Sequence, residues 1–362
     1  MNRLEHNERI TIMWFQQLTG IKETSPNQVR SQLELSGNTL ISKANGAHLI
    51  SGKLDTPTLA ELRSHVNKLN LPKGKLNMTE TVDDVGQLHT KLKNEGALFQ
   101  VASQFNLLEM SSPNVTPEQG IAGYEHDHTQ GPACAIACGA GIIYRNYFAP
   151  LSGQVGQSFD QQIDTIKDLG LALGNTNGQL WEMRNGYVLA SESGLKEITH
   201  ILKNQTVTER DILREKLRIG IQWDTQVTRE GCKHLVTQVY GSALPIAYSP
   251  HSSQLWAEFA KLILEASYEA TLCSAAINMA KTGNNSVYLA LLGGGTFGNH
   301  DAWIFDAPRS FGLERNAREV SLVLDYEMDN GMTISSVTAS HKNEYGSFED
   351  FDRRVTAGQT GT

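Results

Sequence analysis

A glycine-rich segment near the carboxyl end of the chain restricts the folds that this sequence can adopt. The residues Gly293-Gly294-Gly295-Thr296-Phe297-Gly298-Asn299 follow the apolar run SVYLALL and precede a helical pattern that starts near His300. A second apolar run, VSLVLDY, comes after that pattern. A strand, a glycine loop, a helix and a strand in this order are typical of a parallel crossover. The sequence therefore predicts an α/β fold.

Other local signals place elements along the rest of the chain. Asn-Gly dipeptides between apolar runs, at 45–46 and 185–186, predict two β-hairpins because this pair reaches positive φ at low cost. Apolar residues at helical spacing predict amphipathic helices, and a run of small residues predicts a helix that lies close to a neighbouring backbone. These helices are expected over 59–69, 132–147 and 254–281.

Composition excludes several classes of protein. The 362 residues are 40% hydrophobic and 19% charged, which favours a folded chain over a disordered one. The net charge of −8 argues against a broad basic surface for nucleic acid or for an anionic membrane. The apolar runs are too short to span a bilayer, and the charged N-terminus does not look like a secretory signal. With four cysteines in so long a chain, we expect a cytoplasmic protein without a disulfide framework.

The glycine loop is a candidate phosphate site. Its backbone N–H groups would converge at the carboxyl edge of a sheet, where side chains would otherwise prevent the backbone from approaching an anion. It is not a Walker A loop, because no Gly-Lys-Ser/Thr follows, and it does not match the dinucleotide-binding pattern in register. The alternative is a tight turn that packs the helix on the sheet.

The segment SVYLALLGGGTFGNHDAWIFDA resembles the last strand, phosphate loop and helix of macrodomains, a family that binds ADP-ribose. Upstream, GALFQVASQFNLLEM is similar to the macrodomain strand that ends in an Asn-containing loop, and GIAGYEHDHTQGPACAIACGAG to the second loop and small-residue helix. The resemblance covers about 85–145 and 215–327. This chain has no GDIT-type motif, carries ASQFN in place of NAAN, and lacks the QEE of the poly(ADP-ribose) glycohydrolase branch.

The resemblance implies a three-layer α/β/α sandwich with a mixed sheet. We expect residues 1–84 to form an N-terminal extension of a hairpin and helices packed on the core. The macrodomain-like core is expected over 85–345, with an insertion at about 150–215. Residues 346–362 would then form a flexible tail.

The resemblance also implies roles for individual residues. Asn106, just beyond a buried strand, would lie near the distal ribose and act in catalysis by orienting it, although it fits an ordinary loop asparagine as well. Phe297 would stack on a ribose or base. The residues that would contact the diphosphate are Gly293, Gly294, Gly295, Thr296, Phe297, Gly298 and Asn299.

Acidic side chains flank the two loops that would close over the same crevice. Asp127 or Glu109 is the predicted catalytic carboxylate, acting as a general base on water that attacks a glycosidic carbon, with Glu125 as a further candidate. The alternative for each of them is a solvated side chain with no role in a site. Gln130 is a candidate ligand-binding residue because its amide can donate a hydrogen bond.

Two histidines and two cysteines within thirteen residues suggest a zinc site at His126, His128, Cys134 and Cys138. The three-residue gap between the cysteines is a poor match to structural zinc spacing, and both lie in an apolar, small-residue run. We therefore expect no metal and favour core packing for the cysteines.

These observations lead to one leading hypothesis and one main competitor. The leading hypothesis is a protein that binds ADP-ribose or a related nucleotide diphosphate and hydrolyses ADP-ribose from a modified macromolecule. The competitor is a non-catalytic reader of ADP-ribosylated partners or of a free nucleotide of this type. A zinc-dependent hydrolase is the third alternative.

Overall fold

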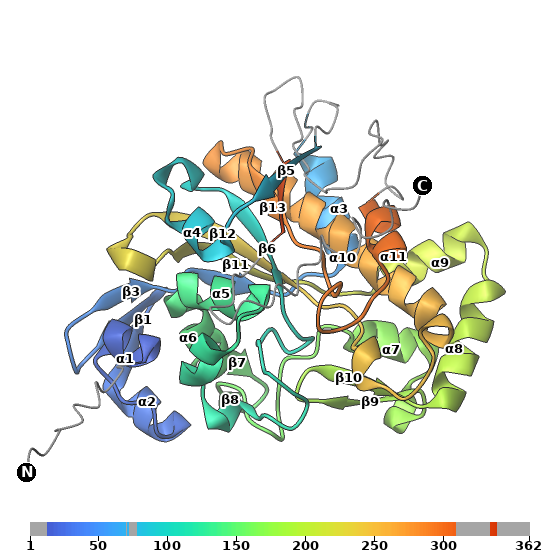
Figure 1. Ribbon diagram of the computed structural model, residues 1–362, viewed down its shortest axis with the longest axis horizontal. Coiled ribbons are helices and arrows are strands. Elements are labelled where there is room, and N and C mark those ends of the chain that lie inside the picture. Colours follow the sequence, from blue (N-terminus) through green and yellow to red (C-terminus); the bar gives the residue numbers. More distant parts are fainter. Residues whose placement is uncertain (1–12, 70, 72–77, 309–333, 339–362) are drawn as a thin grey trace, which may run out of the picture.

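The largest sheet has seven strands in the order β4-β11-β12-β6-β13-β14-β5 (Figure 1). The computed structural model describes residues 13–69, 71, 78–308 and 334–338. Strand β11 pairs antiparallel with β4 and β12, whereas the other neighbouring strands are parallel, so the predicted mixed sheet is confirmed. The strands are β4 (Lys53–Asp55), β5 (Met78–Val82), β6 (Leu98–Ala102), β11 (Gly220–Gln226), β12 (Leu235–Gly241), β13 (Val287–Leu289) and β14 (Ile334–Thr338).

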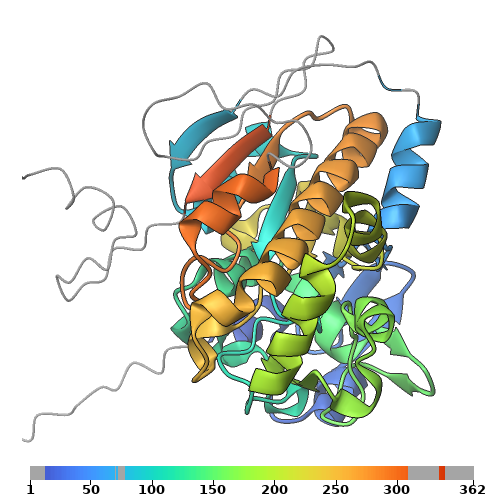
Figure 2. The ribbon, with the colours of Figure 1, turned by 90° about the vertical axis from the view of Figure 1, so that its right-hand side faces the viewer.

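Helices cover both faces of this sheet, as Figures 1 and 2 show. The alternation of side chains along β6 reflects this arrangement. Leu98 packs in the core cluster that contains the long helix α10, whereas Phe99 and Val101 pack on the opposite face with α4 and α5. The three-layer α/β/α architecture is thus confirmed. One layer contains α3 (Leu59–Lys68), α8 (Glu192–Lys203), α9 (Val207–Arg214) and α10 (Ser253–Thr282), and the other α4 (Val85–Thr90), α5 (Gln130–Ala137) and α6 (Gly139–Tyr147).

Local sequence signals explain where several of these helices begin and end. Helix α3 starts with a capping box, in which Thr58 accepts from the Glu61 backbone and Glu61 from the Thr58 backbone. Helix α10 ends at Gly283, whose φ of 76° suits glycine. The small-residue run forms two helices and not the single expected one, because Cys138 leaves the helical conformation at ψ 58°. The 3-10 turns are η1 (Leu92–Asn94), η2 (Pro117–Gln119), η3 (Ala122–His126), η4 (Thr176–Gly178), η5 (Arg229–Gly231) and η6 (Ile246–Tyr248).

Both predicted hairpins are present. Strands β2 (Thr39–Ser42) and β3 (His48–Ile50) pair antiparallel around Asn45-Gly46. Strands β9 (Trp181–Arg184) and β10 (Tyr187–Ala190) pair around Asn185 and Gly186, whose φ angles are 47° and 81°. Positive φ at both central residues is what a two-residue hairpin turn of this hand requires.

The N-terminal region is divided between two sheets. Helices α1 (Trp14–Thr19) and α2 (Pro26–Gln32) lie beside a small sheet of β1 (Leu33–Ser36), β2 and β3. This unit buries its apolar side chains with those of α6. Strands β4 and β5, by contrast, form the two edges of the seven-stranded sheet. The region proposed as an extension over 1–84 therefore contributes directly to the central sheet.

Between α6 and β11 the chain forms a group of elements whose apolar side chains pack into the same core cluster as those of α10. It contains β7 (Pro150–Leu151), β8 (Gln154–Val155), α7 (Lys167–Leu173), the β9–β10 hairpin, α8 and α9. These elements occupy the region proposed as an insertion. The predicted strand VSLVLDY and the proposed C-terminal tail lie outside the described residues. Helix α11 (Asp301–Asp306) follows the glycine loop.

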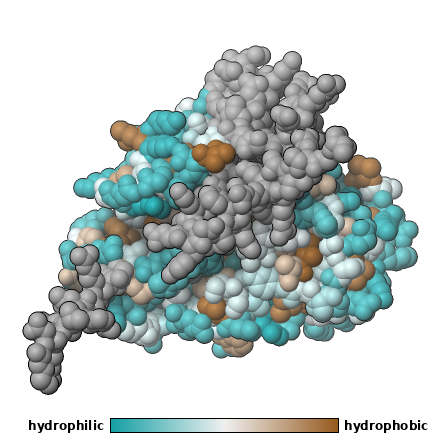
Figure 3. All heavy atoms as spheres, in the orientation of Figure 1, coloured by the Kyte–Doolittle hydropathy of each residue, from teal (hydrophilic) through white to brown (hydrophobic). Residues whose placement is uncertain are grey.

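The visible surface is mainly hydrophilic, with apolar side chains scattered over it (Figure 3). Among the described residues, no helix combines the length and the apolar character that crossing a bilayer requires.

A buried histidine links the α4 layer to the sheet. The His89 ring lies 3.8 Å from the Phe99 ring, centroid to centroid, in a stacked arrangement. Its Nδ1 is 2.7 Å from the Val85 carbonyl oxygen, and its Nε2 is 3.0 Å from the side-chain nitrogen of Gln238. These partners assign a neutral ring, protonated on Nδ1 and accepting on Nε2. Burial lowers the pKa of His89 to about 4.

The lowered pKa predicts a pH-dependent contribution to stability. Because the folded pKa of His89 lies below its unfolded value, this contribution is complete above about pH 6.5 and is lost as the pH falls through about 4. We expect the stability difference between wild type and His89→Gln to shrink by about 3 kcal/mol over this window. Urea unfolding between pH 4 and 7, with the exposed His48→Gln as control, measures it. A pH-independent difference would contradict the prediction.

Candidate functional site

The glycine loop lies at the carboxyl edge of the parallel strands. It follows β13, which pairs with β6, and β6 in turn pairs with β12. The chain leaving β12 runs directly beside the loop, since the Ala247 backbone N–H donates to the Phe297 carbonyl at 3.0 Å. The carboxyl ends of parallel strands are where open α/β sheets bind ligands. The predicted position of the loop is therefore confirmed.

Two glycines give the loop its shape. Gly293 and Gly298 have φ angles of 75° and 71°, which side chains other than hydrogen disfavour. A Cβ on Gly293 would stand 2.2 Å from the Ala243 Cβ and 2.6 Å from the Asn299 side-chain nitrogen. Asn299 is buried and closes the loop, because its Nδ2 donates to the Leu244 carbonyl at 2.8 Å and to that of Gly293 at 3.2 Å.

Three consecutive backbone N–H groups of the loop face no internal acceptor. Gly294 and Gly298 donate within the loop region, to the carbonyls of Leu291 and Gly295. The N–H groups of 295–297 have no hydrogen-bond acceptor in the part of the chain that the structure describes. Gly295 is exposed, and a Cβ built on it meets no atom within 4 Å. The loop thus combines a constrained framework with an open row of donors.

Aromatic side chains from three distant segments meet beside this row of donors. We call Tyr187, Tyr248 and Phe297 the aromatic cluster. Their ring centroids are 5.3 to 5.7 Å apart. Tyr187 is buried and donates its hydroxyl to the Met110 carbonyl at 2.6 Å. The cluster offers ring surfaces against which a sugar or base can pack.

Asp127 lies near this cluster. It directly follows η3, is half-buried, and its Oδ1 accepts from the backbone N–H of Thr129 at 2.9 Å and from the hydroxyl at 2.7 Å. Burial raises the pKa of Tyr187, with further contributions from Tyr248 and from the negative charge of Asp127. The charge of Asp127 therefore acts on the Tyr187 hydroxyl, which lies 60 residues further along the chain.

Glu109, the other predicted catalytic carboxylate, forms a buried ion pair. Its carboxylate is 3.2 Å from Nη2 of Arg145, and both side chains are buried. Arg145 also lies 3.7 Å from the centre of the Tyr240 ring and donates from Nε to the Leu107 carbonyl at 2.7 Å. Burial raises the pKa of Glu109 to about 7, and Arg145 opposes this rise. Glu125, the further candidate, accepts from the Trp14 backbone N–H at 2.8 Å.

The two predicted amide residues also use their polar atoms internally. Asn106 is fully buried; its Nδ2 donates to Gln162 at 2.8 Å and its Oδ1 accepts from the Leu108 N–H at 3.1 Å. Gln130 accepts from the Ala102 N–H at 2.8 Å and donates to the Gln100 carbonyl at 2.9 Å. In this structure the amides of Asn106 and Gln130 bond to protein groups on and around β6.

Two residues near the N-terminus hold the segment that carries Asp127 in place, which the sequence analysis did not predict. The Glu23 carboxylate accepts from the backbone N–H groups of Ile121 at 2.9 Å and Ala122 at 2.7 Å, and from the Tyr147 hydroxyl. The Trp14 indole donates to the Ala122 carbonyl at 3.1 Å. No signal near residue 23 in the sequence indicates these contacts, which join segments about a hundred residues apart.

The four residues proposed for a zinc site do not lie together in the structure. Cys134 and Cys138 are buried in an apolar cluster, whereas His126 and His128 are exposed. Burial raises the pKa of both thiols. Among the residues that the structure describes, no three His, Cys, Asp or Glu side chains are arranged to hold a metal ion. The cysteines are part of the core, as expected.

No model of a known protein family matches the sequence, and no curated protein does. The chain is similar in structure to the poly(ADP-ribose) glycohydrolase of Thermomonospora curvata, at 10% identity and a TM-score of 0.44, over 88% of this chain and 92% of that one. It is also similar to the structure of that glycohydrolase bound to the inhibitor ADP-HPD, at 11% identity and a TM-score of 0.42, over 91% of this chain and 95% of that one. A third similar structure is a mutant of the Deinococcus radiodurans poly(ADP-ribose) glycohydrolase in complex with ADP-ribose. Its sequence identity is 10% and its TM-score 0.41, over 84% of this chain and 94% of that one.

Proposed function

We propose that this protein binds the diphosphate of ADP-ribose, or of a related nucleotide diphosphate, in the glycine loop and hydrolyses ADP-ribose from a modified substrate. The observation that carries the proposal is the row of backbone donors at 295–297, which have no acceptor among the described residues and lie at the carboxyl edge of the sheet. Successive N–H groups of this kind form an anion-binding concavity. A diphosphate supplies the acceptors that they lack.

The surroundings of the loop suit a nucleotide better than a free anion. Phe297 is half-buried between Tyr187 and Tyr248 and extends the loop with aromatic surface. A ribose attached to the diphosphate would pack against this surface. Among the site residues, Gly293, Gly298 and Asn299 act by shaping the loop, while 295–297 make the contacts.

In the hydrolytic step, the Asp127 carboxylate acts as the general base. In this mechanism a water oxygen attacks the anomeric carbon of the ribose while Asp127 takes a proton from that water. The glycosidic bond breaks, its electron pair stays on the released atom of the modified substrate, and that atom takes a proton from solvent, to which Asp127 later returns its own. Asp127 is half-buried beside the aromatic cluster, whereas Glu109 already neutralises the buried Arg145. Asn106 and Glu109 then act indirectly, because their hydrogen bonds hold the loops around β6 in position.

One observation favours the competing function, a reader without catalysis. Asn106 and Glu109, both predicted to act in catalysis, are buried with their polar atoms bonded within the protein. If Asp127 serves only to cap the turn at Thr129, the loop would still bind the nucleotide. Binding without turnover by the wild-type protein would identify the reader.

The first test is calorimetric titration of the protein with ADP-ribose, with AMP and ADP as controls. Micromolar affinity selective for ADP-ribose is the expected result. If none of the three nucleotides binds, the loop is only a structural turn and the proposed function fails.

A charge change at Gly295 tests the anion site directly. Because a side chain at this position meets open space, Gly295→Glu should fold normally and place a carboxylate beside the proposed phosphates. We expect its affinity for ADP-ribose to fall about thirtyfold, or ~2 kcal/mol, relative to Gly295→Gln, which matches it in size. Calorimetry measures both affinities and thermal unfolding checks the fold. Equal affinities of the two variants would place the diphosphate elsewhere.

A further inference from the structure

The glycine loop begins after strand pairing has already ended. Strand β13 pairs with β6 at Val287 and Tyr288, and with β14 as far as Leu289. Residues 290–292, which lead into the loop, have no partner strand in the part of the chain that the structure describes. The position of this short segment therefore depends on side chains, and helix α10 supplies two of them.

Tyr268 of α10 holds the segment directly. Its hydroxyl donates to the Ala290 carbonyl at 2.6 Å and accepts from the Leu292 N–H at 3.1 Å. The same two backbone groups also bond to each other at 2.9 Å, which closes a three-residue turn. Burial raises the pKa of the Tyr268 hydroxyl, so the group keeps the proton that it donates. Tyr268 thus fastens the turn to the helix.

Thr271, one turn further along α10, holds the same segment through Gln100. The Ala290 N–H donates to Oε1 of Gln100 at 3.1 Å, and Nε2 of Gln100 donates to the Thr271 hydroxyl at 2.9 Å. The Thr271 hydroxyl in turn donates to the Ser267 carbonyl at 2.8 Å. All of these residues are buried, where the loss of a hydrogen-bond partner is costly. Both backbone polar groups of Ala290 therefore bond to side chains.

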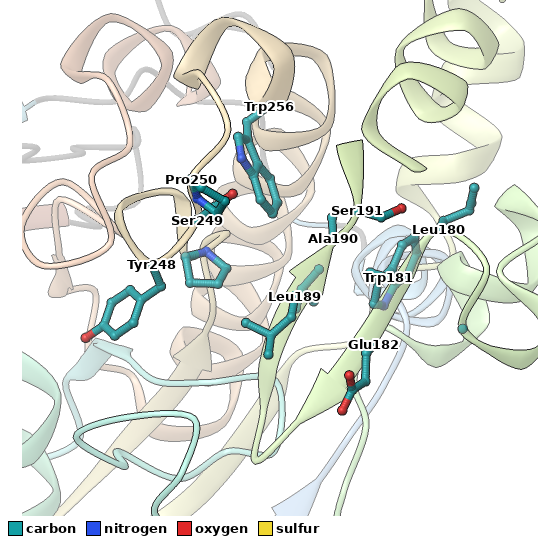
Figure 4. Close-up of a pocket in the computed structure, with 13 residues that line it drawn as sticks. Leu180, Trp181, Glu182, Leu189, Ala190, Ser191, Tyr248, Ser249, Pro250 and Trp256 are labelled. Atoms are coloured by element: carbon teal, nitrogen blue, oxygen red, sulfur yellow. The ribbon is translucent and has the colours of Figure 1, made fainter. Parts of the chain in front are cut away.

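The start of the same helix lies beside the exit of the loop. His300 Nε2 is 2.9 Å from the Ser253 hydroxyl, and this contact is exposed to water. The turn at 245–250, which is hydrogen-bonded to the loop, leads into α10. In Figure 4 the Trp256 indole of α10 lies beside Pro250 of this turn, and a pocket of about 420 Å³ separates the turn from the β9–β10 hairpin. The buried contacts at the entry are thus the stronger attachment of the loop to α10.

We propose that Tyr268 is a positioning residue for the glycine loop. By fastening the turn at 290–292 to α10, it sets the direction of the N–H groups of 295–297 and limits the motion of the loop before a ligand binds. Donors that are already held in place bind an anion more tightly, because less conformational entropy is lost on binding. The part of the proposal that concerns ADP-ribose rests on the proposed function, whereas the part that concerns the loop does not.

Hydrogen exchange of the protein without ligand, followed by mass spectrometry, tests the attachment. Tyr268→Phe keeps the ring and removes the hydroxyl. We expect exchange in 290–299 to become about tenfold faster, because the hydrogen bonds within the loop open more often, while exchange in β12 stays unchanged. Tyr288→Phe is the matched control, since Tyr288 is a buried tyrosine of β13 whose hydroxyl donates to Asn94 at 2.8 Å, ahead of β6.

Calorimetry with ADP-ribose tests the consequence for binding. Tyr268→Phe should weaken the affinity about tenfold, whereas Tyr288→Phe should bind as the wild type does. In a hydrolysis assay the loss should appear in KM, with kcat nearly unchanged. Thr271→Val removes the acceptor of Gln100 and should change exchange and affinity in the same direction by a smaller factor. If Tyr268→Phe does not fold, Thr271→Val provides the test.

Wild-type exchange rates in 290–299 of Tyr268→Phe would overturn the proposal. An equal acceleration in Tyr288→Phe, or one spread over the whole protein, would overturn it as well. Faster exchange of the loop with an unchanged affinity for ADP-ribose would overturn the part that concerns the ligand. Failure of the proposed function is distinguishable, because the wild-type protein would then bind no ADP-ribose, and the exchange rates would still decide whether Tyr268 positions the loop.

Discussion

Replacing Asp127 by asparagine is expected to lower the rate of ADP-ribose hydrolysis about a thousandfold while ADP-ribose still binds. Asparagine keeps an oxygen that can accept from Thr129, so the turn before α5 is preserved, but it cannot take a proton from water. The loss should therefore appear in kcat and leave KM and the calorimetric affinity nearly unchanged.

Release of ADP-ribose from a modified protein or oligonucleotide, followed by chromatography, measures this rate. Glu118→Gln is a suitable control, because Glu118 lies in the same loop region at η2 and its carboxylate accepts from the Phe159 N–H at 2.7 Å. If Asp127→Asn hydrolyses the substrate as fast as wild type, Asp127 is not the catalytic base. A wild-type protein that binds ADP-ribose without hydrolysing it would establish the reader function.

Gly293→Ala is expected to destabilise the folded protein by about 4 kcal/mol and to abolish nucleotide binding. Alanine at a φ of 75° is strained, and its Cβ would also overlap the Ala243 Cβ and the Asn299 amide. Either the loop or the end of β12 has to move. Both movements would disturb the donors at 295–297.

A second glycine with the same backbone conformation separates the effect of backbone strain from that of the Cβ overlap. Gly283 has nearly the same φ, 76°, and a Cβ there meets no atom within 4 Å, so Gly283→Ala measures the backbone strain alone. Urea unfolding should show Gly293→Ala to be less stable than Gly283→Ala by about 2 kcal/mol. The added substitution Ala243→Gly should restore part of that difference. Equal stabilities of the two alanine variants would show that the loop is not packed against β12 as described.

Elements set by neighbouring residues could be predicted from the sequence. The turn at Asn185-Gly186 depends on two residues that tolerate positive φ, and the start of α3 depends on a hydroxyl and a carboxylate three positions apart. The glycine loop after β13 was predicted in the same way. The break at Cys138 was missed, because both halves of that run have the same small-residue composition.

The use of each polar side chain could not be predicted, because it depends on partners that are distant in the chain. Asn106, Glu109 and Gln130 looked available for a ligand, yet each pairs with a group that the fold brings to it: Gln162, Arg145 and the β6 backbone respectively. A buried polar atom must be satisfied, and the nearest donor or acceptor is decided by packing and not by spacing.

The sequence by itself determined the class of fold and the position of the glycine loop, because both depend on local patterning and on glycine's conformational freedom. Only the tertiary structure decided the composition of the site. Tyr187, Tyr248 and Phe297 come from three segments and share no motif. They meet because parallel strands end at one edge of the sheet, so the segments that follow those strands converge there with the hairpin, whatever their separation in the chain.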